Sequence, residues 1–287
     1  MEFREITVDE LDFVSAICLD PSVSRREAMR EHMENRLNWL RKMMSQELKI
    51  IVALENPKPE VLHCPWAGNI RHADLAVKGK VPKGLIEYLP IEMALEPVKG
   101  ENSLFINCVW ILPPFWKTGV AKGLMQLFIE EARKWGGATV LAYEGDKWFG
   151  TSLKYMPSSF FKKFGFKEVS RDGTRVLLHL DLGARKSPML VSPKRRVIGE
   201  KGETVIDVFC NSQCPWCGRM VDKISRNIRK YSDVTLNVIN TDRRDVIEQF
   251  GVSRGVFING EPVIKRMASW KEIKSALNKF TNRNVDS

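Results

Sequence analysis

The stretch that decides the fold runs from Asn107 to Leu124 and reads NCVWILPPFWKTGVAKGL. Its first residues are mostly apolar and include β-branched side chains, which is typical of a buried strand. Pro113-Pro114 ends that strand, because proline cannot donate to a sheet ladder. After Gly119 the apolar residues recur at helical spacing. The stretch therefore predicts a strand followed directly by a helix.

The loop between this strand and this helix is suited to bind a phosphate group. A helix start has backbone N–H groups without intrahelical partners and carries partial positive charge. Gly119, Ala121 and Gly123 would let a ligand approach the backbone closely, and Lys117 and Lys122 add full positive charges. We predict a pyrophosphate-binding loop, although a glycine-rich helix start with ordinary surface lysines would show the same pattern.

Outward from this stretch, residues 1–182 mix strand and helix periodicity. We expect strands over residues 1–7, 48–54, 84–95, 104–112, 139–143, 166–169 and 176–180. We expect helices after Asp9, over residues 24–44 and over residues 120–135, the last ended by Gly136-Gly137. The mixture predicts an α+β or mixed α/β domain, with a mixed central sheet and flanking helices.

A domain boundary is predicted over residues 183–202, where proline, glycine, serine and basic residues gather without apolar periodicity. Most of the net charge of +10 comes from this segment and from the residues after it. Its densest basic run, Lys194-Arg195-Arg196, lacks interleaved aromatic residues and reads as a tether. Nucleic acid is therefore not expected as the main partner.

The composition places the chain among soluble proteins of a reducing compartment. Residues 1–10 lack the basic and apolar layout of a signal peptide. The longest apolar stretch, residues 104–116, is interrupted and too short to span a bilayer. Six cysteines in 287 residues are too few for a secreted disulfide scaffold. We expect a cytoplasmic protein with no membrane partner.

Residues 203–287 predict a second, smaller domain with the order βαβ, α, ββα. The expected strands cover residues 204–209, 234–239, 256–258 and 262–264, and the expected helices follow the cysteine loop to about residue 230 and cover residues 243–250 and 269–280. Asn259-Gly260-Glu261 joins the last two strands into a hairpin.

Three cysteines of this second part, Cys210, Cys214 and Cys217, lie in the sequence CNSQCPWC. The first interpretation is a redox pair, in which a helix N-terminus lowers the pKa of Cys214 and Cys217 resolves the mixed disulfide. The second is an iron–sulfur site, which would need a larger barrel than seventy following residues provide. The third is a zinc site, but no histidine follows His179 to complete it. No metal is expected.

The phosphate loop resembles the acetyl-coenzyme A signature of the GNAT acetyltransferase superfamily, here Trp116-Lys-Thr-Gly-Val-Ala121. A second signature, an aromatic pair before Gly-Phe, resembles Phe160-Phe-Lys-Lys-Phe-Gly-Phe166. The resemblance covers about residues 1–182 and implies a GNAT-like mixed sheet, acetyl-CoA as cofactor and N-acetyltransferase activity. By resemblance, the cofactor-binding residues are Val109, Trp110, Ile111, Trp116, Lys117, Thr118, Gly119, Val120, Ala121, Lys122, Phe160 and Phe161.

Two positions depart from that family's pattern. Trp116 stands where Gln or Arg is usual, so a phosphate contact must come from the backbone or from Lys117. Phe161 stands where many members carry a tyrosine that protonates the leaving thiolate, and Tyr155 is the candidate replacement.

The resemblance implies direct attack of a small-molecule or peptide amine on the thioester, whose carbonyl a backbone N–H near Val109 to Ile111 would polarise. The candidate bases are Glu87, Glu92 and Glu144, each of which is also a candidate for a plain strand-end charge. Cys108 is most simply a buried inert thiol, and an acyl-cysteine intermediate is the alternative.

Residues 204–280 resemble the thioredoxin and glutaredoxin family, through the strand, Cys-Pro-Trp-Cys, helix, strand run and the hairpin after it. Ser253-Arg254-Gly255 stand where that family carries a cis-proline, which weakens the expected docking of a thiol partner. The two parts together resemble YoaP-like acetyltransferases.

The leading hypothesis is an acetyltransferase with a thioredoxin-like redox or docking domain. The alternatives are a thiol–disulfide oxidoreductase using Cys214 and Cys217 with a degenerate CoA-binding domain, and a sensor in which oxidation of these thiols changes acetyl-CoA affinity. The resemblance also leaves a homodimer through a sheet edge open.

Overall fold

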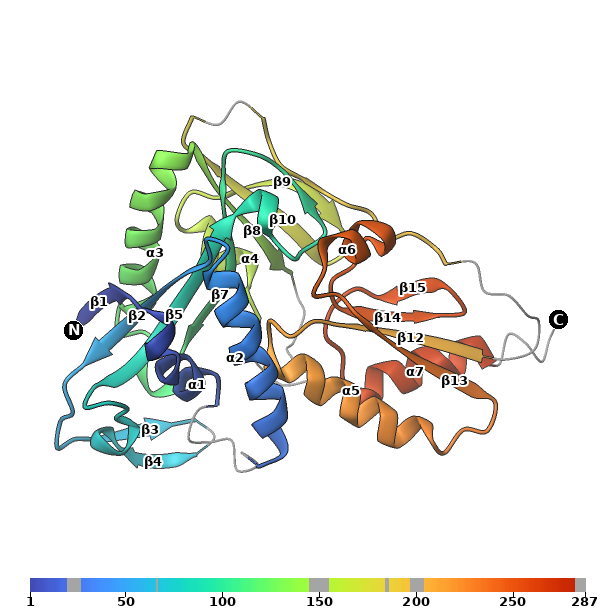
Figure 1. The fold of residues 1–287 in the computed structure, drawn as a ribbon, viewed down its shortest axis with the longest axis horizontal. Coiled ribbons are helices and arrows are strands. Elements are labelled where there is room, and N and C mark those ends of the chain that lie inside the picture. Colours follow the sequence, from blue (N-terminus) through green and yellow to red (C-terminus); the bar gives the residue numbers. More distant parts are fainter. Residues whose placement is uncertain (20–26, 66, 145–154, 184–185, 197–203, 282–287) are drawn as a thin grey trace.

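The computed structural model describes residues 1–19, 27–65, 67–144, 155–183, 186–196 and 204–281. Two sheets lie side by side in it, one in residues 1–182 and one in residues 204–281, called below the first half and the second half (Figure 1). Ser24, inside a predicted helix, and residues 197–202 of the predicted boundary lie outside the described residues.

The first half is built on a seven-stranded sheet with the order β1-β2-β5-β7-β8-β10-β9. The strands are β1 (Glu2–Glu5), β2 (Lys49–Glu55), β5 (Val81–Pro90), β7 (Leu104–Ile111), β8 (Gly137–Tyr143), β9 (Lys167–Asp172) and β10 (Arg175–Asp181). All neighbours are antiparallel except β7 and β8, which run parallel. The predicted mixed central sheet is therefore confirmed.

Helices cover both faces of this sheet. α1 (Asp12–Cys18) and α2 (Arg30–Met44) pack on one face, while α3 (Val120–Ala132) and α4 (Ser158–Lys162) pack on the other. Alternate residues of β5 and β7 supply the two cores: Leu85 and Phe105 face α1 and α2, and Ile86 and Ile106 face α3. Burial of both sheet faces explains why the strands read as nearly continuous apolar runs.

Two glycines are required by this packing. Gly123 of α3 lies against the Phe3 ring, where an added Cβ would come within 2.3 Å of a ring carbon. Because Gly123 has no side chain, α3 can pack closely against Phe3 of β1. Gly136 has φ 86° and ends the helical region in the left-handed conformation that favours glycine. The predicted stop at Gly136 is confirmed.

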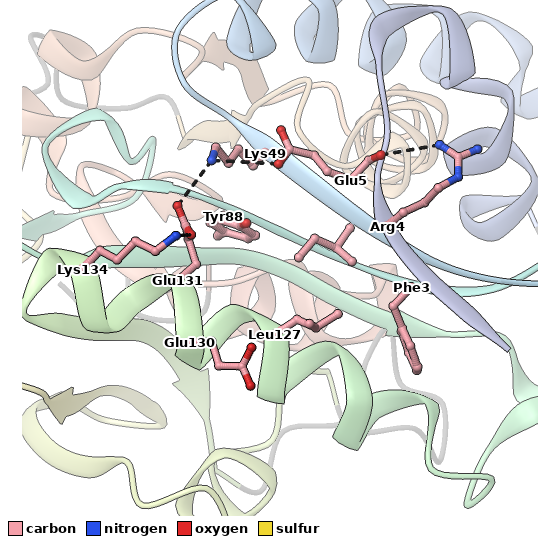
Figure 2. A pocket seen from close by; sticks show the side chains of 10 residues that line it. Phe3, Arg4, Glu5, Lys49, Tyr88, Leu127, Glu130, Glu131 and Lys134 are labelled. Carbon is pink, nitrogen blue, oxygen red and sulfur yellow. Dashed lines mark hydrogen bonds and ion pairs between the residues drawn. The ribbon is translucent and has the colours of Figure 1, made fainter.

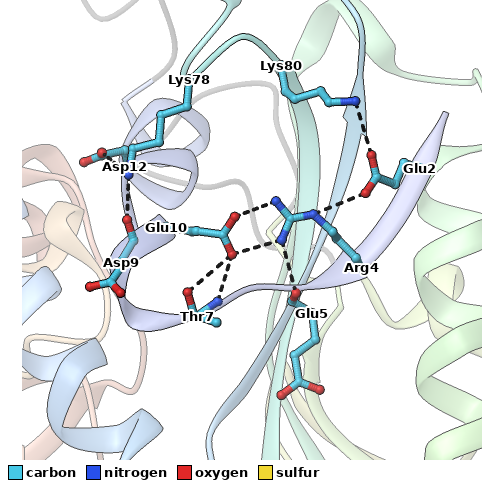
Figure 3. Close-up of polar contacts among 9 residues, drawn as sticks. All are labelled: Glu2, Arg4, Glu5, Thr7, Asp9, Glu10, Asp12, Lys78 and Lys80. Carbon is cyan, nitrogen blue, oxygen red and sulfur yellow. Dashed lines mark hydrogen bonds and ion pairs between the residues drawn. The ribbon is translucent and has the colours of Figure 1, made fainter.

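Hydrogen bonds and ion pairs among several side chains stabilise the segment that precedes α1 (Figure 3). The Arg4 guanidinium donates to both carboxylate oxygens of Glu10, at 2.9 and 2.5 Å. The Thr7 backbone N–H donates to the same carboxylate at 3.1 Å. This bond lets Glu10 cap the short helical turn at residues 8–10 that leads into α1.

The second half is a four-stranded sheet with the order β13-β12-β14-β15. Its elements are β12 (Thr204–Cys210), α5 (Pro215–Ile228), β13 (Val234–Asn240), α6 (Arg244–Phe250), β14 (Gly255–Ile258), β15 (Glu261–Ile264) and α7 (Trp270–Thr281). β12 pairs with β13 in parallel and with β14 antiparallel. Asn259 and Gly260 both have positive φ and form the predicted hairpin turn. The predicted element order is confirmed.

The segment between the halves is not the loose tether that its composition predicted. β11 (Met189–Leu190) pairs with β6 (Val98–Lys99) of the first half. Farther along, the Lys194 and Arg196 backbone N–H groups donate to carbonyls of the second half, at 3.0 and 3.1 Å. The backbone hydrogen bonds of this segment are thus used to join the halves, which single-residue composition cannot reveal.

Other differences are local. The expected strand over residues 84–95 is shorter, because Pro90 ends β5 and a single helical turn follows at residues 91–93. A hairpin of β3 (Val61–Cys64) and β4 (Gly68–Arg71) was not expected from the sequence. Among the described residues, no helix combines the length and apolar character needed to cross a bilayer.

Candidate active site

The two parallel strands of the first half part near their middle. β7 and β8 pair only from Leu104 to Ile106 on one side and from Ala138 to Val140 on the other, although both strands continue further. On its other edge, where it pairs with β5, β7 has a bulge. Glu87 of β5 pairs with Cys108, and the next residue, Tyr88, pairs with Ile106. Asn107 of β7 therefore has no partner on β5. A bulge bends its strand, and here it coincides with the point where β7 leaves β8.

Beyond this point, residues 155–157 lie beside β8. The Tyr143 backbone N–H donates to the Met156 carbonyl at 3.0 Å, and Tyr143 forms an isolated parallel bridge with Pro157. Since Arg175 of β10 pairs with Tyr143 on the opposite edge, residues 155–157 lie on the side of β8 that faces β7. The parted strands therefore carry Tyr155 at their open end, with its ring centroid 6.0 Å from that of Tyr143.

The predicted phosphate loop is exposed and has the required backbone. Lys117 and Gly119 have φ 64° and 87°, and no atom lies within 4 Å of a Cβ placed on Gly119. The first bond of α3 is donated by Gly123 to the Gly119 carbonyl. The N–H groups of Val120, Ala121 and Lys122 thus precede the intrahelical ladder, as an anion site at a helix start requires.

The other predicted cofactor-binding residues differ in their exposure. Trp116 is 37% exposed, and its indole N–H donates to the Ile111 carbonyl at 2.8 Å. Val109, Trp110 and Ile111 are half-buried on the part of β7 that has left β8, and Thr118 is exposed. Both phenylalanines belong to α4. Phe161 is buried in the core, whereas Phe160 is half-buried.

The three candidate bases lie in different places. Glu87 is fully buried in the middle of β5, and one of its oxygens accepts from the Arg36 guanidinium of α2. Its other oxygen, Oε2, is buried and has no hydrogen-bond partner among the described residues. Burial raises the pKa of Glu87, and the attraction of Arg36 opposes that rise.

Glu92 and Glu144 do not join Glu87. Glu92 is exposed after the end of β5 and accepts from the Asn102 backbone N–H at 3.1 Å. Glu144 binds Arg171, Lys162 and Ser158 at the surface, and hydrogen bonds from these groups, Arg171 first, lower its pKa to about 2. These contacts give both residues the structural role of strand-end charges.

The cysteine loop of the second half reaches the same region. Gln213 is buried, and its side-chain amide donates to the carbonyl of Asn107, the bulged residue, at 3.0 Å. Its main-chain carbonyl accepts from Arg36. The Arg254 guanidinium binds the Gln213 side chain at 2.8 Å and the Glu96 carboxylate of the first half at 2.6 Å.

The cysteines of this loop differ from the predicted redox arrangement. Burial raises the pKa of Cys214 to about 11, against the attraction of Arg254 and Arg36. A hydrogen bond from the Trp216 backbone N–H at the start of α5 also lowers this pKa, but burial outweighs it, so the net shift of Cys214 is opposite to the one expected. Cys217 instead exchanges a hydrogen bond with Cys210, and this bond brings the pKa of Cys217 below its ordinary value despite burial. The close pair is Cys210 and Cys217.

Two thiols, those of Cys18 and Cys108, lie near Glu87, and Tyr155 lies near Cys108. Cys18 at the end of α1 hydrogen-bonds with Arg36, and burial raises the pKa of this thiol. Burial also raises the pKa values of Cys108 and Tyr155 well above their ordinary ranges, and the Cys108 thiol is among the groups acting on Tyr155. Both groups therefore stay protonated at neutral pH.

Four of these residues, Arg36, Glu96, Gln213 and Arg254, were not singled out from the sequence. Arg36 offered a signal: it lies at helical spacing from Met33 and Leu40, so it falls on the apolar face of α2. A charge on that face needs a buried partner. The other three offered none, because each has at least one partner in the opposite half.

A separate cavity of about 410 Å³ lies between β1, β2, β5 and α3 (Figure 2). Phe3, Ile51, Tyr88 and Leu127 form its apolar part, and Lys49 bridges to Glu131 at its edge. None of the predicted cofactor-binding residues lines it.

Comparison with known proteins agrees with this geometry. Residues 43–147 match the model of the acetyltransferase (GNAT) family. The Bacillus subtilis (strain 168) protein described as an uncharacterized N-acetyltransferase, YoaP, is 26% identical over 203 residues, which cover 68% of this chain and 78% of that protein.

Solved structures with similarity include two acetyltransferases in complex with coenzyme A. The PaiA N-acetyltransferase of Thermoplasma acidophilum is 12% identical, with a TM-score of 0.38 over 63% of this chain and 99% of that one. The YhbS acetyltransferase of Escherichia coli is 11% identical, with a TM-score of 0.39 over 63% of this chain and 81% of that one. The match to the family model covers β7, the predicted phosphate loop and α3, so this part of the chain is similar to GNAT acetyltransferases.

Proposed function

We propose that this protein transfers the acetyl group of acetyl-CoA to an amine, with Glu87 as the base. The observation that carries the proposal is the position of Glu87, directly opposite Cys108 at the bulge where β7 leaves β8. Its Oε2 has no hydrogen-bond partner among the described residues, so it is able to accept a proton from an amine.

The phosphate loop fits acetyl-CoA. Gly119 is exposed, and open space lies around the position that its Cβ would take. The helix start offers the N–H groups of Val120, Ala121 and Lys122, and Lys117 and Lys122 add positive charge. We assign the phosphates of the cofactor to this loop and its thiol arm to the free edge of β7, with Phe160 beside it. When bound, acetyl-CoA supplies an activated thioester carbonyl.

The residues of this chain would then carry out three proton transfers. Glu87 takes a proton from the ammonium form of the acceptor, which frees the nitrogen lone pair for attack on the carbonyl carbon. A backbone N–H of β7 between Val109 and Ile111 stabilises the developing oxyanion. The carbon–sulfur bond breaks, Tyr155 gives its phenolic proton to the leaving thiolate, and the resulting phenolate takes the second proton from the acetylated nitrogen. The products are an acetylated amine and the free thiol.

The first experiment is calorimetric titration of the reduced full-length protein with acetyl-CoA. We expect micromolar binding, which corresponds to about −8 kcal/mol. Gly119→Val should weaken it at least tenfold, because a β-branched side chain strains the positive φ and fills the approach to the loop. Gly173→Val is the matched control, since Gly173 also has positive φ and open space but lies in the β9–β10 turn.

An amine panel should then identify the acceptor, and Glu87→Gln should slow transfer about 10²-fold or more without changing acetyl-CoA affinity. Absence of acetyl-CoA binding by the wild-type protein would refute the proposed function.

For the second half, we propose a thioredoxin-like domain, divided from the first by residues 183–202, that serves for docking. Its sheet order and the helix after the cysteine loop support the resemblance. The raised pKa of Cys214 and the insertion of its loop against Arg36 and Asn107 favour docking over catalysis.

Thiol–disulfide exchange is the second candidate function. It is favoured by the hydrogen bond between Cys210 and Cys217, which stabilises the thiolate form of Cys217. A reduction potential in the range of catalytic exchangers would support it, and resistance of the thiols to oxidation by a small disulfide would refute it.

A further inference from the structure

Gln213 lies at the centre of the contact between the halves, and the reaction proposed above does not use it. It is 2% exposed and follows β12 in the cysteine loop. A glutamine carries one side-chain acceptor, a pair of side-chain donors and a main-chain carbonyl, so a buried one needs several partners. Gln213 finds them on both halves of the chain.

The main-chain carbonyl of Gln213 fixes the candidate base. It accepts from Nη1 of Arg36, while Nη2 of the same guanidinium binds Glu87. Arg36 and Glu87 are 2% and 0% exposed, so neither group has bulk water as an alternative partner. The planar guanidinium couples the positions of its two partners, because one terminal nitrogen is bonded to Gln213 and the other to Glu87.

The side chain of Gln213 fixes the bulge. Its Nε2 donates to the carbonyl of Asn107, the residue that has no pair on β5. Its Oε1 accepts from Arg254, which Glu96 of the first half holds in place. One residue of the second half is thus bonded to α2, to β7 and, through Arg254, to the turn that precedes β6.

Several buried polar atoms around these contacts have no hydrogen-bond partner among the described residues. They belong to both halves: Nε of Arg36, Oε2 of Glu87, both side-chain atoms of Asn107, and Nδ2 of Asn211. Buried polar groups are normally satisfied, so a group of unpaired atoms on both sides of a contact indicates a place built for a polar ligand.

We propose that the acceptor part of the acetyl-transfer site is formed by both halves of the chain, and that Gln213 is a positioning residue for Glu87 and for the Asn107 bulge. This inference rests on the proposed function for its chemistry, but the positioning of Glu87 and of the Asn107 bulge can be tested without acetyl transfer. The second half then serves as a wall of the site, and its cysteine loop excludes water from the base.

The test compares Gln213→Ala with Ser212→Ala in the full-length protein. Ser212 is the neighbouring loop residue, and its hydroxyl donates to Asp242 of the second half at 2.7 Å. Both variants remove loop hydrogen bonds, but only Gln213→Ala removes a side-chain bond to the first half, the one to Asn107. Its main-chain carbonyl can still accept from Arg36, so the test isolates the side chain. The readout is a carboxyl ¹³C NMR titration of Glu87, assigned by loss of its signal in Glu87→Gln.

We expect Gln213→Ala to lower the pKa of Glu87 by about one unit, because water reaches a carboxyl whose pKa is raised chiefly by burial. Ser212→Ala should leave it unchanged. Gln213→Met removes the same side-chain hydrogen bonds but fills the space, so it should admit less water and lower the Glu87 pKa by less than Gln213→Ala does. An unchanged Glu87 pKa in both Gln213 variants would overturn the proposal.

Calorimetry with acetyl-CoA separates this inference from the function on which it rests. Wild type and all three variants should bind acetyl-CoA equally, because the phosphate loop lies outside these contacts. If the wild-type protein does not bind it, the acetyl-transfer function fails, while the Glu87 titration still decides whether Gln213 positions that residue.

Discussion

Gly218 of α5 lies against the imidazole of His32 in α2, so close that an added Cβ would come within 2.4 Å of Nδ1. The other ring nitrogen of His32 contacts Asp222 at 2.7 Å, one turn further along α5. The two helices, from opposite halves, can approach this closely only because position 218 has no side chain (Figure 1).

Gly218→Ala should therefore destabilise the protein by about 1–3 kcal/mol, because the added methyl group overpacks the contact. Urea unfolding measures the change. His32→Ala in the same chain should recover most of the loss, since it removes the ring that the methyl group meets. In an exposed helix the same substitution is stabilising, so increased stability would mean that the halves do not pack here.

Cys214 should be alkylated slowly at neutral pH. Burial raises its pKa to about 11, so its thiolate fraction at pH 7 is about 10²-fold below that of a free cysteine. Iodoacetamide labelling followed by peptide mass spectrometry measures the rate, with free cysteine as the reference. The rate should rise about tenfold per pH unit up to pH 10. Fast labelling at pH 7 would contradict the raised pKa and would support the sequence-based prediction that Cys214 is a nucleophile with a low pKa.

Tyr155→Phe should slow acetyl transfer about 10²-fold and leave the affinity for acetyl-CoA unchanged, because it removes only a proton donor. Tyr143→Phe is the matched control, since its ring lies beside that of Tyr155. The amine found by the panel serves as substrate. Equal losses in the two variants would show a packing effect and would exclude Tyr155 as the acid.

Glu10 should contribute stability that depends on pH. Its hydrogen bonds to Arg4 lower its pKa from 4.5 to about 2 (Figure 3). The folded state therefore favours the ionised form, and the contribution is complete above pH 4.5 and is lost as the pH falls toward 2. The pair is partly exposed, so the contribution should stay below about 1 kcal/mol.

Glu10→Gln should accordingly destabilise the protein at pH 7 and approach wild-type stability near pH 2, as measured by thermal unfolding across this range. Asp9→Asn provides the control, because Asp9 contributes only its backbone carbonyl to the group. If the stability difference between wild type and Glu10→Gln does not become smaller at low pH, the pairing of Glu10 with Arg4 is not its cause.

Local sequence patterns determined much of the first half. The apolar run before Pro113-Pro114 predicted β7, and the residues after Gly119 predicted α3, because both signals act between near neighbours in the chain. The order of elements after residue 203 followed in the same way, including the turn at Asn259-Gly260. The phosphate loop could be located for the same reason.

The assignment among the three glutamates needed the tertiary structure. Glu87, Glu92 and Glu144 look alike in the sequence, but only β5 in the middle of the sheet buries its carboxylate. Its pairing with Cys108 depends on a bulge in β7, and a bulge depends on sheet register that composition does not encode.

The contact between the halves was likewise decided by tertiary structure alone. Arg36 and Gln213 are separated by 177 positions, and Arg254 and Glu96 by 158. Each is an ordinary polar residue in its own segment, and its function arises from a partner on the other half. The sequence by itself determined the elements and the position of the exposed loop before α3, whereas burial and long-range pairing decided which charges meet at Glu87.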